Sequence, residues 1–517
     1  MKAMNRRNFF GVLGGAAVAA GVGVPLLSGI HGSTSTGTLL LSRAPLPARF
    51  RLPLAVPPVL TPVRSDAAGD HYEVVQRAAD VELIPGLRTR IWGYNGIFPG
   101  PTIVSRSGRP TVVRHRNELP APVVVHLHGG RTPSSEDGYP TDLLMPVAVA
   151  PGQGHHHDMA GAVTIGERDY RYPLEQRAAT LWYHDHRMDF TGPSVWRGLA
   201  GFHLVHDDEE DALPLPRGER DLPLMIADRS FAEDGSLLYP SLDPTLTTPG
   251  VMDAYSPGVL GDVILVNGVP WPLAEVSAAR HRLRLLNASN ARRYRLALDP
   301  PPPGGGGLVQ IGTDAGLLER PLRHDAIEMA PAQRYDVVVD FGAYRVGQEV
   351  TLVNEFGSGP TAQVMRFRVA RAAHDDSRVP DRLSRIVPLD RADAVVTRTL
   401  RFRHDTMHGM TGWTINGLPF GPDVVHARAR LGTVEVWRLI TDFHHPIHLH
   451  LAPFQVLSRG NGGPGAYDLG WKDTLDLRPA EQAEIIVRFD GYPGRYVFHC
   501  HNLEHEDMAM MGNLLVA

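Results

Sequence analysis

The chain has 517 residues, enough for two to four domains that each bury a hydrophobic core of their own. Its formal net charge of -5 argues against nucleic acid as the main partner. The 53 glycines and 44 prolines favour a turn-rich, mostly β protein, the 25 histidines make metal binding the first function to test, and the single cysteine excludes an internal disulfide.

The N-terminus has the features of a targeting segment. Arg6-Arg7 precedes Asn8-Phe9-Phe10 and a weakly apolar run over residues 11–30, a pattern that resembles a twin-arginine signal. The run lacks the apolarity of a stable transmembrane helix, and no clear A-x-A cleavage site follows it; the alternatives are a lipophilic anchor or plain disorder. We expect a signal segment over residues 1–32, the twin-arginine export machinery as a partner, and an exported protein that is periplasmic, cell-surface or extracellular.

Short alternating segments separated by Gly, Pro, Asn and Asp fill the rest of the chain, a pattern typical of β-sandwiches. One arrangement occurs three times, as an Asn-Gly pair followed by proline and then two strands. The pairs are Asn95-Gly96, Asn267-Gly268 and Asn416-Gly417, the first strands are expected at 111–116, 281–286 and 433–440, and the second at 122–128, 293–298 and 446–451. We therefore predict three similar domains, at 45–212, 213–375 and 394–517.

Four His-x-His pairs stand out, and all of them lie in the outer two blocks: His126/His128, His184/His186, His448/His450 and His499/His501. On a strand, residues i and i+2 point to one face, about 6.5–7 Å apart. Two such rings can reach one metal or two adjacent metals, and eight imidazoles exceed what one ion needs. The pairs predict a polynuclear site, although imidazole suits Zn, Cu and Fe alike.

The residues around Cys500 identify the metal. A lone cysteine is ordinarily a buried, inert side chain, but on a strand Cys500 faces away from its neighbours His499 and His501. The thiolate is then directed to one metal site and the imidazoles to another. His505 and Met510 follow closely, and His445 is the natural candidate for a second histidine; one Cys, two His and a thioether form the blue-copper ligand set.

These motifs resemble the four copper signatures of the multicopper oxidase family, in the family's order and spacing. They read His126-Leu-His128-Gly-Gly, Trp182-Tyr-His184-Asp-His186, His445-Pro-Ile-His448-Leu-His450 and His499-Cys500-His501. The likeness runs from about Trp92 to the C-terminus. Asp137-Gly-Tyr-Pro and Gly470-Trp-Lys-Asp-Thr474 resemble the bacterial spore-coat laccase and bilirubin oxidase branch.

The resemblance implies an all-β chain of three consecutive cupredoxin-like Greek-key β-sandwich domains, with a trinuclear cluster between the first and the third. It also implies four copper ions. By matched position, type 1 copper has His445, Cys500, His505 and axial Met510, type 2 copper has His126 and His448, and the type 3 pair has His128, His184, His186, His450, His499 and His501.

The implied activity couples one-electron oxidation of a small phenolic, aminophenolic or tetrapyrrole reductant to four-electron reduction of dioxygen to water. Glu506 and Asp137 match acidic residues that relay protons; the alternative for each is a solvated charge or a hydrogen-bond partner of a ligand histidine. Trp471 and Asp473 resemble residues near the type 1 site, where Asp473 would hydrogen-bond substrate or a ligand histidine. Axial Met510 suggests a low-to-moderate reduction potential.

Two other functions compete with this interpretation. A cuprous-ion oxidase of copper homeostasis is the nearer one, and Met407 and Met410 with His404 and His408 would form a small cuprous-ion port, although packing and loop roles are favoured there. A copper-free structural protein of the same fold is the other; it is opposed by the occupation of all twelve ligand positions. The loop histidines His155-His156-His157 are interpreted as solvated rather than as a copper site.

Overall fold

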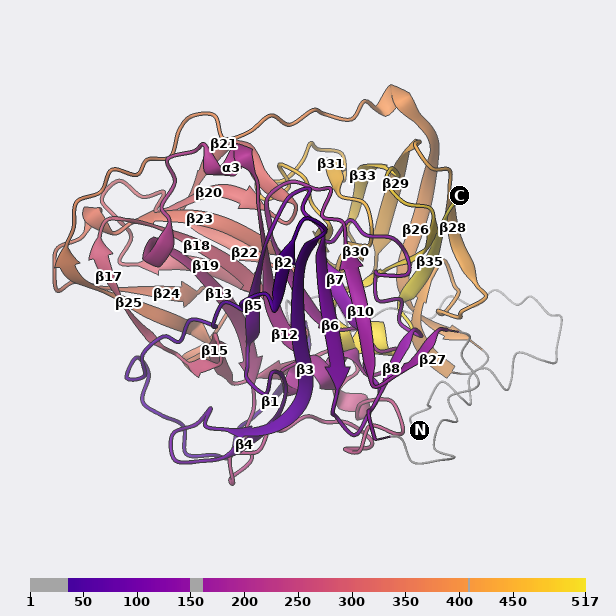
Figure 1. The fold of residues 1–517 in the computed structure, drawn as a ribbon, viewed down its shortest axis with the longest axis horizontal. Helices are drawn as coiled ribbons and strands as arrows, with labels where there is room; N and C mark the ends of the chain where they lie inside the picture. The colour runs from indigo at the N-terminus through magenta and orange to yellow at the C-terminus, as the bar shows by residue number, and fades with distance from the viewer. Residues whose placement is uncertain (1–35, 149–160, 408–409) are drawn as a thin grey trace.

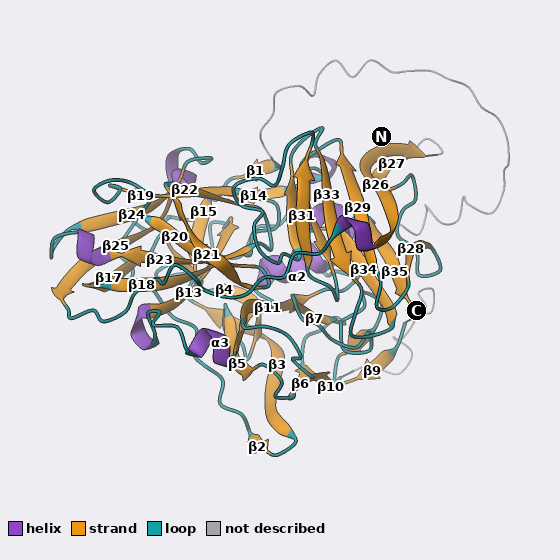
Figure 2. Cartoon of the chain, turned by 90° about the horizontal axis from the view of Figure 1, so that it is seen from above, coloured by secondary structure: helices purple, strands orange, loops and turns teal. Residues whose placement is uncertain are grey.

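The computed structural model describes residues 36–148, 161–407 and 410–517 (Figure 1). The signal segment expected at 1–32, the loop histidines at 155–157 and His408 lie outside these residues. Strands dominate the described chain, and the few helices are short (Figure 2). Each of the three blocks forms two β-sheets around its own core, which confirms the all-β prediction of three cupredoxin-like sandwiches.

The first block holds a five-stranded and a four-stranded sheet. Along one of its strands, buried and more exposed residues alternate from Thr111 to Asn117, so one face packs inward. The strands are β2 (Arg64–Asp66), β3 (Gly69–Val81), β4 (Thr89–Tyr94), β6 (Thr111–Asn117) and β10 (Glu167–Tyr172) in one sheet, and β5 (Gly100–Arg106), β7 (Val125–His128), β11 (Ala179–Asp185) and β12 (Ala200–His206) in the other.

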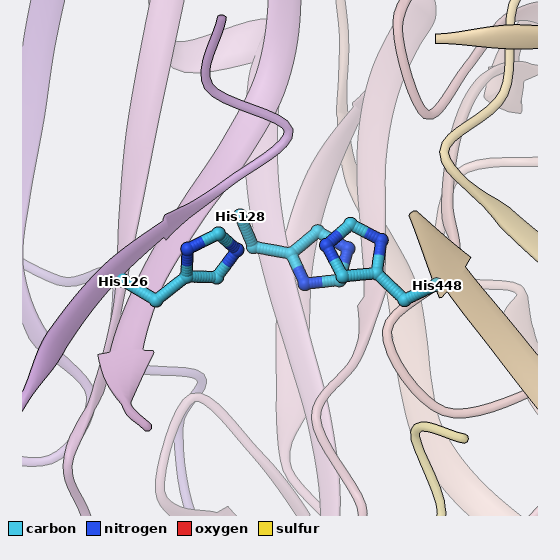
Figure 3. A group of neighbouring side chains, drawn as sticks. All are labelled: His126, His128 and His448. Carbon is cyan, nitrogen blue, oxygen red and sulfur yellow. The ribbon is translucent and has the colours of Figure 1, made fainter. Parts of the chain in front are cut away.

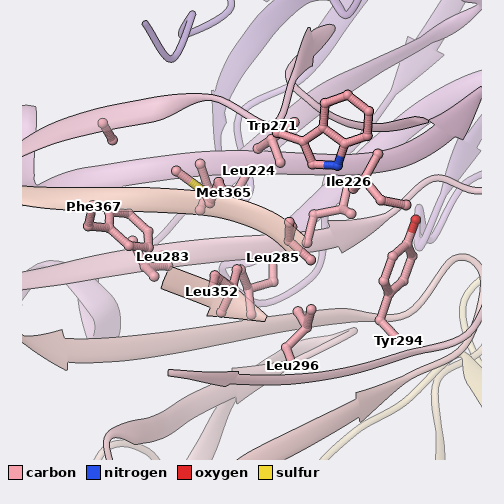
Figure 4. Close-up of a cluster of buried hydrophobic side chains, with 14 of the residues drawn as sticks. Leu224, Ile226, Trp271, Leu283, Leu285, Tyr294, Leu296, Leu352, Met365 and Phe367 are labelled. Atoms are coloured by element: carbon pink, nitrogen blue, oxygen red, sulfur yellow. The ribbon is translucent and has the colours of Figure 1, made fainter. Parts of the chain in front are cut away.

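The middle block holds a seven-stranded and a five-stranded sheet. Side chains such as Leu283, Leu285 and Phe367 fill the space between them with no exposed surface (Figure 4). The strands are β13 (Asp221–Arg229), β15 (Val263–Val266), β16 (Val269–Pro270), β18 (Arg280–Asn287), β20 (Leu308–Thr313), β21 (Gly316–His324) and β23 (Arg334–Asp340) in one sheet, and β17 (Leu273–Ala278), β19 (Tyr294–Asp299), β22 (Ala326–Met329), β24 (Glu349–Asn354) and β25 (Gln363–Ala372) in the other.

The third block pairs two five-stranded sheets, and its core includes Cys500 and Met510. The strands are β26 (Ala394–Met407), β27 (Met410–Ile415), β29 (Val434–Thr441), β31 (Phe454–Arg459) and β33 (Gln482–Arg488) in one sheet, and β28 (Val425–Ala429), β30 (His445–Leu449), β32 (Thr474–Leu477), β34 (Gly494–Cys500) and β35 (Met511–Val516) in the other.

Short strands and helices complete the fold. Two small parallel pairs consist of β1 (Thr38–Leu40) with β14 (Val259–Gly261) and β8 (Leu143–Met145) with β9 (Val163–Ile165). The helices are α2 (Thr191–Arg197), α3 (Asp208–Asp211) and α4 (Leu503–Asp507). Asp507 of α4 accepts hydrogen bonds from the backbone N–H groups of Thr191 and Gly192, both at 2.8 Å, and so ties the third block to the start of α2. Among the described helices, none has the length and apolarity needed to cross a membrane.

Candidate metal centre

Strand register brings the four histidine pairs together. In the first block β7 and β11 are antiparallel, with His126 opposite His184 and His128 opposite Trp182. In the third block β30 and β34 place His448 opposite His499 and Ile447 opposite Cys500. Because successive residues alternate faces, Cys500 points away from its histidine neighbours, as expected from the sequence.

The eight paired histidines form one buried cluster between the first and third blocks. Their ring nitrogens fall into three groups, within each of which the donor atoms lie inside 4.8 Å of one another. Rings from the two blocks stack directly: His128 lies on His448 with centroids 3.6 Å apart (Figure 3), and His126 lies on His450 with centroids 3.9 Å apart. The groups are His126, His128 and His448; His128, His184 and His501; and His186, His450 and His499.

The donor atoms of this cluster fit metal ions. Nδ1 of His126 donates to the carbonyl of Asp137 at 2.6 Å and Nδ1 of His184 to that of Asp185 at 2.8 Å. Nε2 of both rings is buried and has no hydrogen-bond partner among the described residues, as is also true of Nε2 of His448. A buried polar atom without a partner is costly, whereas a ligand histidine characteristically bonds the protein through its other nitrogen.

Burial also keeps these rings in the form that binds metal. Loss of solvation lowers the pKa of His184 to about 3 and of His186 to about 4, and it lowers the pKa of His126, His448 and His501 well below the usual value. The rings are therefore neutral at physiological pH and each offers a lone pair.

A second group lies around Cys500. Its Sγ is 3.4 Å from Nδ1 of His445 and 3.5 Å from Nδ1 of His505, and all three side chains are buried. Each histidine is fixed through its other nitrogen, His445 by Asp442 at 3.1 Å and His505 by the carbonyl of Pro257 at 3.0 Å. The Met510 side chain is fully buried in the same core cluster. Burial raises the pKa of the Cys500 thiol, so a metal must displace its proton on binding.

Two carboxyl groups bridge the histidine cluster from opposite sides. Asp137 Oδ2 is 2.7 Å from Nδ1 of His450, and Glu506 Oε2 is 3.1 Å from Nδ1 of His499. Both acids are about 1% exposed, which excludes a solvated surface role. Burial raises the pKa of Asp137 well above its usual value; for Glu506 burial acts in the same direction, but attraction by His499 and His186 lowers its pKa to about 2.

Asp473 lies at the histidine cluster and not beside Cys500, and there it hydrogen-bonds a proposed ligand histidine, one of the two roles expected for it. Its Oδ1 lies 3.2 Å from Nε2 of His128, and its carbonyl accepts from Nδ1 of His448 at 2.9 Å, so it belongs to the histidine cluster. Trp471 lines a cavity of about 460 Å³ that reaches His126 and His450. The reason is topological: residues 471–473 lead into β32, which pairs with β30 at the end that carries His448.

Several contacts around the histidine cluster and the Cys500 group were not predicted from the sequence. Trp413 packs on His505 with ring centroids 3.7 Å apart, and Asp442 holds His445. Arg334 of the middle block binds Asp473 with both terminal nitrogens. Asp442 lies three residues before a ligand candidate, which is a usable signal, but Trp413 and Arg334 belong to no motif. Nothing is described of the Met407 and Met410 side chains, so the expected cuprous-ion port stays a prediction.

Comparisons with known proteins agree with this arrangement. Family models described as multicopper oxidase match residues 76–210 and 394–517. The chain is 37% identical to a laccase of Bacillus subtilis, over 89% of this chain and 96% of that protein, and 36% identical to a bilirubin oxidase of Albifimbria verrucaria, over 89% and 80%. Among solved structures, a laccase from Pediococcus acidilactici superimposes with a TM-score of 0.78 at 30% identity, covering 93% of this chain and 95% of that one.

Proposed function

Because this chain belongs to the multicopper oxidase family and is laccase-like within it, we propose that it holds four copper ions on the residues that the family motifs mark. The Cys500 site would be held by His445, Cys500, His505 and Met510, and the histidine cluster by His126 and His448 for one ion and by His128, His184, His186, His450, His499 and His501 for a pair. The observation that carries this proposal is the convergence of buried, unpartnered imidazole nitrogens from two blocks.

Bound copper would supply the one-electron chemistry by which a laccase-type oxidase couples a reductant to dioxygen. The protein's own residues link the two proposed copper sites and line a cavity beside the histidine cluster. His499 and His501 flank Cys500 in the chain, so the thiolate is joined covalently to the histidine cluster through the backbone. The cavity lined by Trp471 gives a water-sized molecule a route to His126 and His450.

The two carboxyl groups are placed to hold and move protons. Glu506 lies between His186 and His499, at 3.5 and 3.1 Å, and its low pKa leaves it ionised and able to accept a proton. Asp137 lies 2.7 Å from Nδ1 of His450, and because burial raises its pKa it holds a proton more readily than Glu506 does. Water formation consumes protons, and these are the acids nearest to the rings.

The reductant we propose is a small phenol, aminophenol or tetrapyrrole, since the relatives are named laccase and bilirubin oxidase. Oxygen consumption of the copper-loaded protein, compared across bilirubin, a dimethoxyphenol, an aminophenol and cuprous ion, tests this. Faster turnover of an organic reductant is expected; oxidation of cuprous ion alone would overturn it.

Cys500→Ser tests the ligand assignment itself. Serine keeps the size of the side chain but cannot supply a thiolate, so the blue absorption and at least about 99% of phenol oxidation should disappear, a loss of about 100-fold or about 2.7 kcal/mol. Ala429→Ser, at a small buried residue of the same core on β28, is the matched control. Phenol oxidation retained by Cys500→Ser would refute the assignment.

We also propose export through the twin-arginine pathway, on the motif at Arg6-Arg7. Replacing both arginines with lysine should leave the protein in the cytoplasm in a fractionation experiment; unchanged export would refute the pathway.

A further inference from the structure

The middle block carries none of the proposed copper ligands, yet its Arg334 side chain binds Asp473, a residue that contacts the histidine cluster. Arg334 begins β23 and is fully buried. All five of its N–H donors have acceptors. Nε donates to the Thr180 carbonyl at 2.9 Å, Nη1 to the Ala332 carbonyl and to Asp473 Oδ1 at 3.1 and 2.8 Å, and Nη2 to the Asp314 carbonyl and to Asp473 Oδ2 at 2.8 and 2.5 Å.

A second buried cation strengthens this contact. Lys472 Nζ is 3.0 Å from Asp314 Oδ2, and Asp314 in turn accepts from the backbone N–H of Arg334 at 2.9 Å. All four side chains of this ion network are at most 4% exposed. Two cations thus face two carboxylates, so the charged side chains of this buried network are paired.

The Asp473 carboxylate, held by Arg334, in turn contacts a histidine of the cluster. Its Oδ1 is 3.2 Å from Nε2 of His128 and accepts from the Thr474 hydroxyl at 2.9 Å. A carboxylate can only accept, so Nε2 of His128 carries the proton. The nitrogen left without a partner is then Nδ1, whereas it is Nε2 in His126, His184 and His448. The ring of His128 is therefore turned the opposite way from its neighbours.

We propose that Arg334 is a positioning residue for the histidine cluster: it fixes the Asp473 carboxylate, which holds the His128 ring with Nδ1 toward the metal. This inference rests on the proposed function. The middle block, which holds none of the proposed copper ligands, would then contribute a residue to the dioxygen-reducing site. A bidentate contact with Asp473 requires a guanidinium, and Arg334 of β23 supplies it.

Arg334→Lys and Arg334→Met test the proposal in the full-length, copper-loaded protein. Lysine keeps the charge but cannot form the paired contact, so both variants should bind copper at the histidine cluster roughly 10–100-fold more weakly and weaken the near-ultraviolet absorption of the type 3 pair, to which His128 is assigned. The blue absorption of the Cys500 site should persist. Arg459→Lys and Arg459→Met are the matched controls, since Arg459 makes a similar bidentate pair with Asp468, at 2.6 and 2.8 Å.

A double variant separates positioning from general stability. If Arg334 acts through Asp473, Asp473→Asn alone should give the same spectral change, and Arg334→Met with Asp473→Asn should be no worse than either change alone. Asp473→Asn carries the test if the Arg334 variants do not fold. Full copper content and an unchanged near-ultraviolet absorption of the type 3 pair in Arg334→Lys would overturn the proposal. Wild-type protein without blue absorption would instead overturn the proposed function.

Discussion

Glu506 and Glu504 lie on the same turn of α4 and differ in what they contact. Glu506 faces His186 and His499, whereas Glu504 accepts hydrogen bonds from Tyr239 and Asn290, at 2.9 and 2.8 Å, and from the backbone of Val259. Burial raises the pKa of Glu504 to about 7. Two carboxyl groups two residues apart thus have different pKa values, and of the two only Glu506 contacts His186 and His499.

We therefore expect Glu506→Gln to lower the turnover number with dioxygen by about 10²-fold or more, the usual range for loss of a positioned proton-transfer group. Anaerobic bleaching of the blue absorption by a phenol should stay near the wild-type rate, because that step needs no proton at Glu506. Glu504→Gln is the control and should stay within a few-fold of wild type. Equal losses in the two variants would show that Glu506 has only a structural role.

The sequence predicted the ligands correctly where they lie close together in the chain. The run from His499 to Met510 brings Cys500 and His505 together within one strand end and one helical turn, and the structure has them 3.5 Å apart. The expected position of Asp473 was wrong because the resemblance identified its segment but not which of the two sites its side chain faces. Trp413 and Arg334 could not be foreseen, since their contacts depend on long-range packing that no local pattern encodes.

The strands that carry the ligands are held by their turns. Gly138 follows Asp137 with φ +75°, and a Cβ there would lie 2.2 Å from the Val125 carbonyl and 2.9 Å from Cα of His126. Gly417 has nearly the same conformation, φ +76°, with nothing within 4 Å of its Cβ position. A comparison of the two glycines therefore distinguishes the cost of a left-handed backbone from the cost of a clash with β7.

Gly417→Ala should cost about 1–2 kcal/mol of unfolding free energy, from left-handed strain alone. Gly138→Ala should cost about 1–3 kcal/mol more, because β7 must move away from the new methyl group. That movement displaces His126, so copper content at the histidine cluster should fall in Gly138→Ala only. Denaturant unfolding and metal analysis check both effects; identical behaviour of the two variants would contradict the argument.

The alternation of apolar residues predicted the positions of the strands but not all of their ends. The segment expected at 111–116 is β6 to within one residue. The strand expected at 446–451 is β30, which ends at Leu449, because Leu451 takes φ +69° and the N–H of Ala452 bonds to the carbonyl of His450. His450 thus lies one residue past the end of β30, with its N–H still bonded to the Val497 carbonyl of β34, so the alternation of the strand predicts the face of His450 but not the turn that follows it.

At the scale of the whole molecule, the repeated Asn-Gly arrangement predicted three sandwiches and a middle one without ligand histidines. The sequence could not predict what the middle block contributes. Its Pro257 carbonyl holds His505 and its Arg334 holds Asp473, so it contacts both proposed copper sites. The domain limits at 212–213 and 375–394 stay predictions.

The proposed cluster joins blocks that are far apart in the chain, and copper should therefore stabilise the folded molecule. Its histidines come from residues 126–186 and 448–501 and converge only in the folded state, so copper binds that state preferentially. Free copper at 100 times the dissociation constant would add about 2.7 kcal/mol. Stripping copper with a chelator should lower the midpoint of thermal unfolding, and restoring copper should raise it again.

The two proposed sites should contribute differently to this effect. Cys500, His445 and His505 all belong to the third block, so Cys500→Ser should keep most of the copper-dependent rise in the unfolding midpoint. His126→Asn and His448→Asn remove ligands on either side of the boundary between blocks and should abolish most of it. Calorimetry of each variant with and without copper measures the difference. An equal loss in Cys500→Ser and His126→Asn would mean that the stabilisation does not come from bridging the first and third blocks.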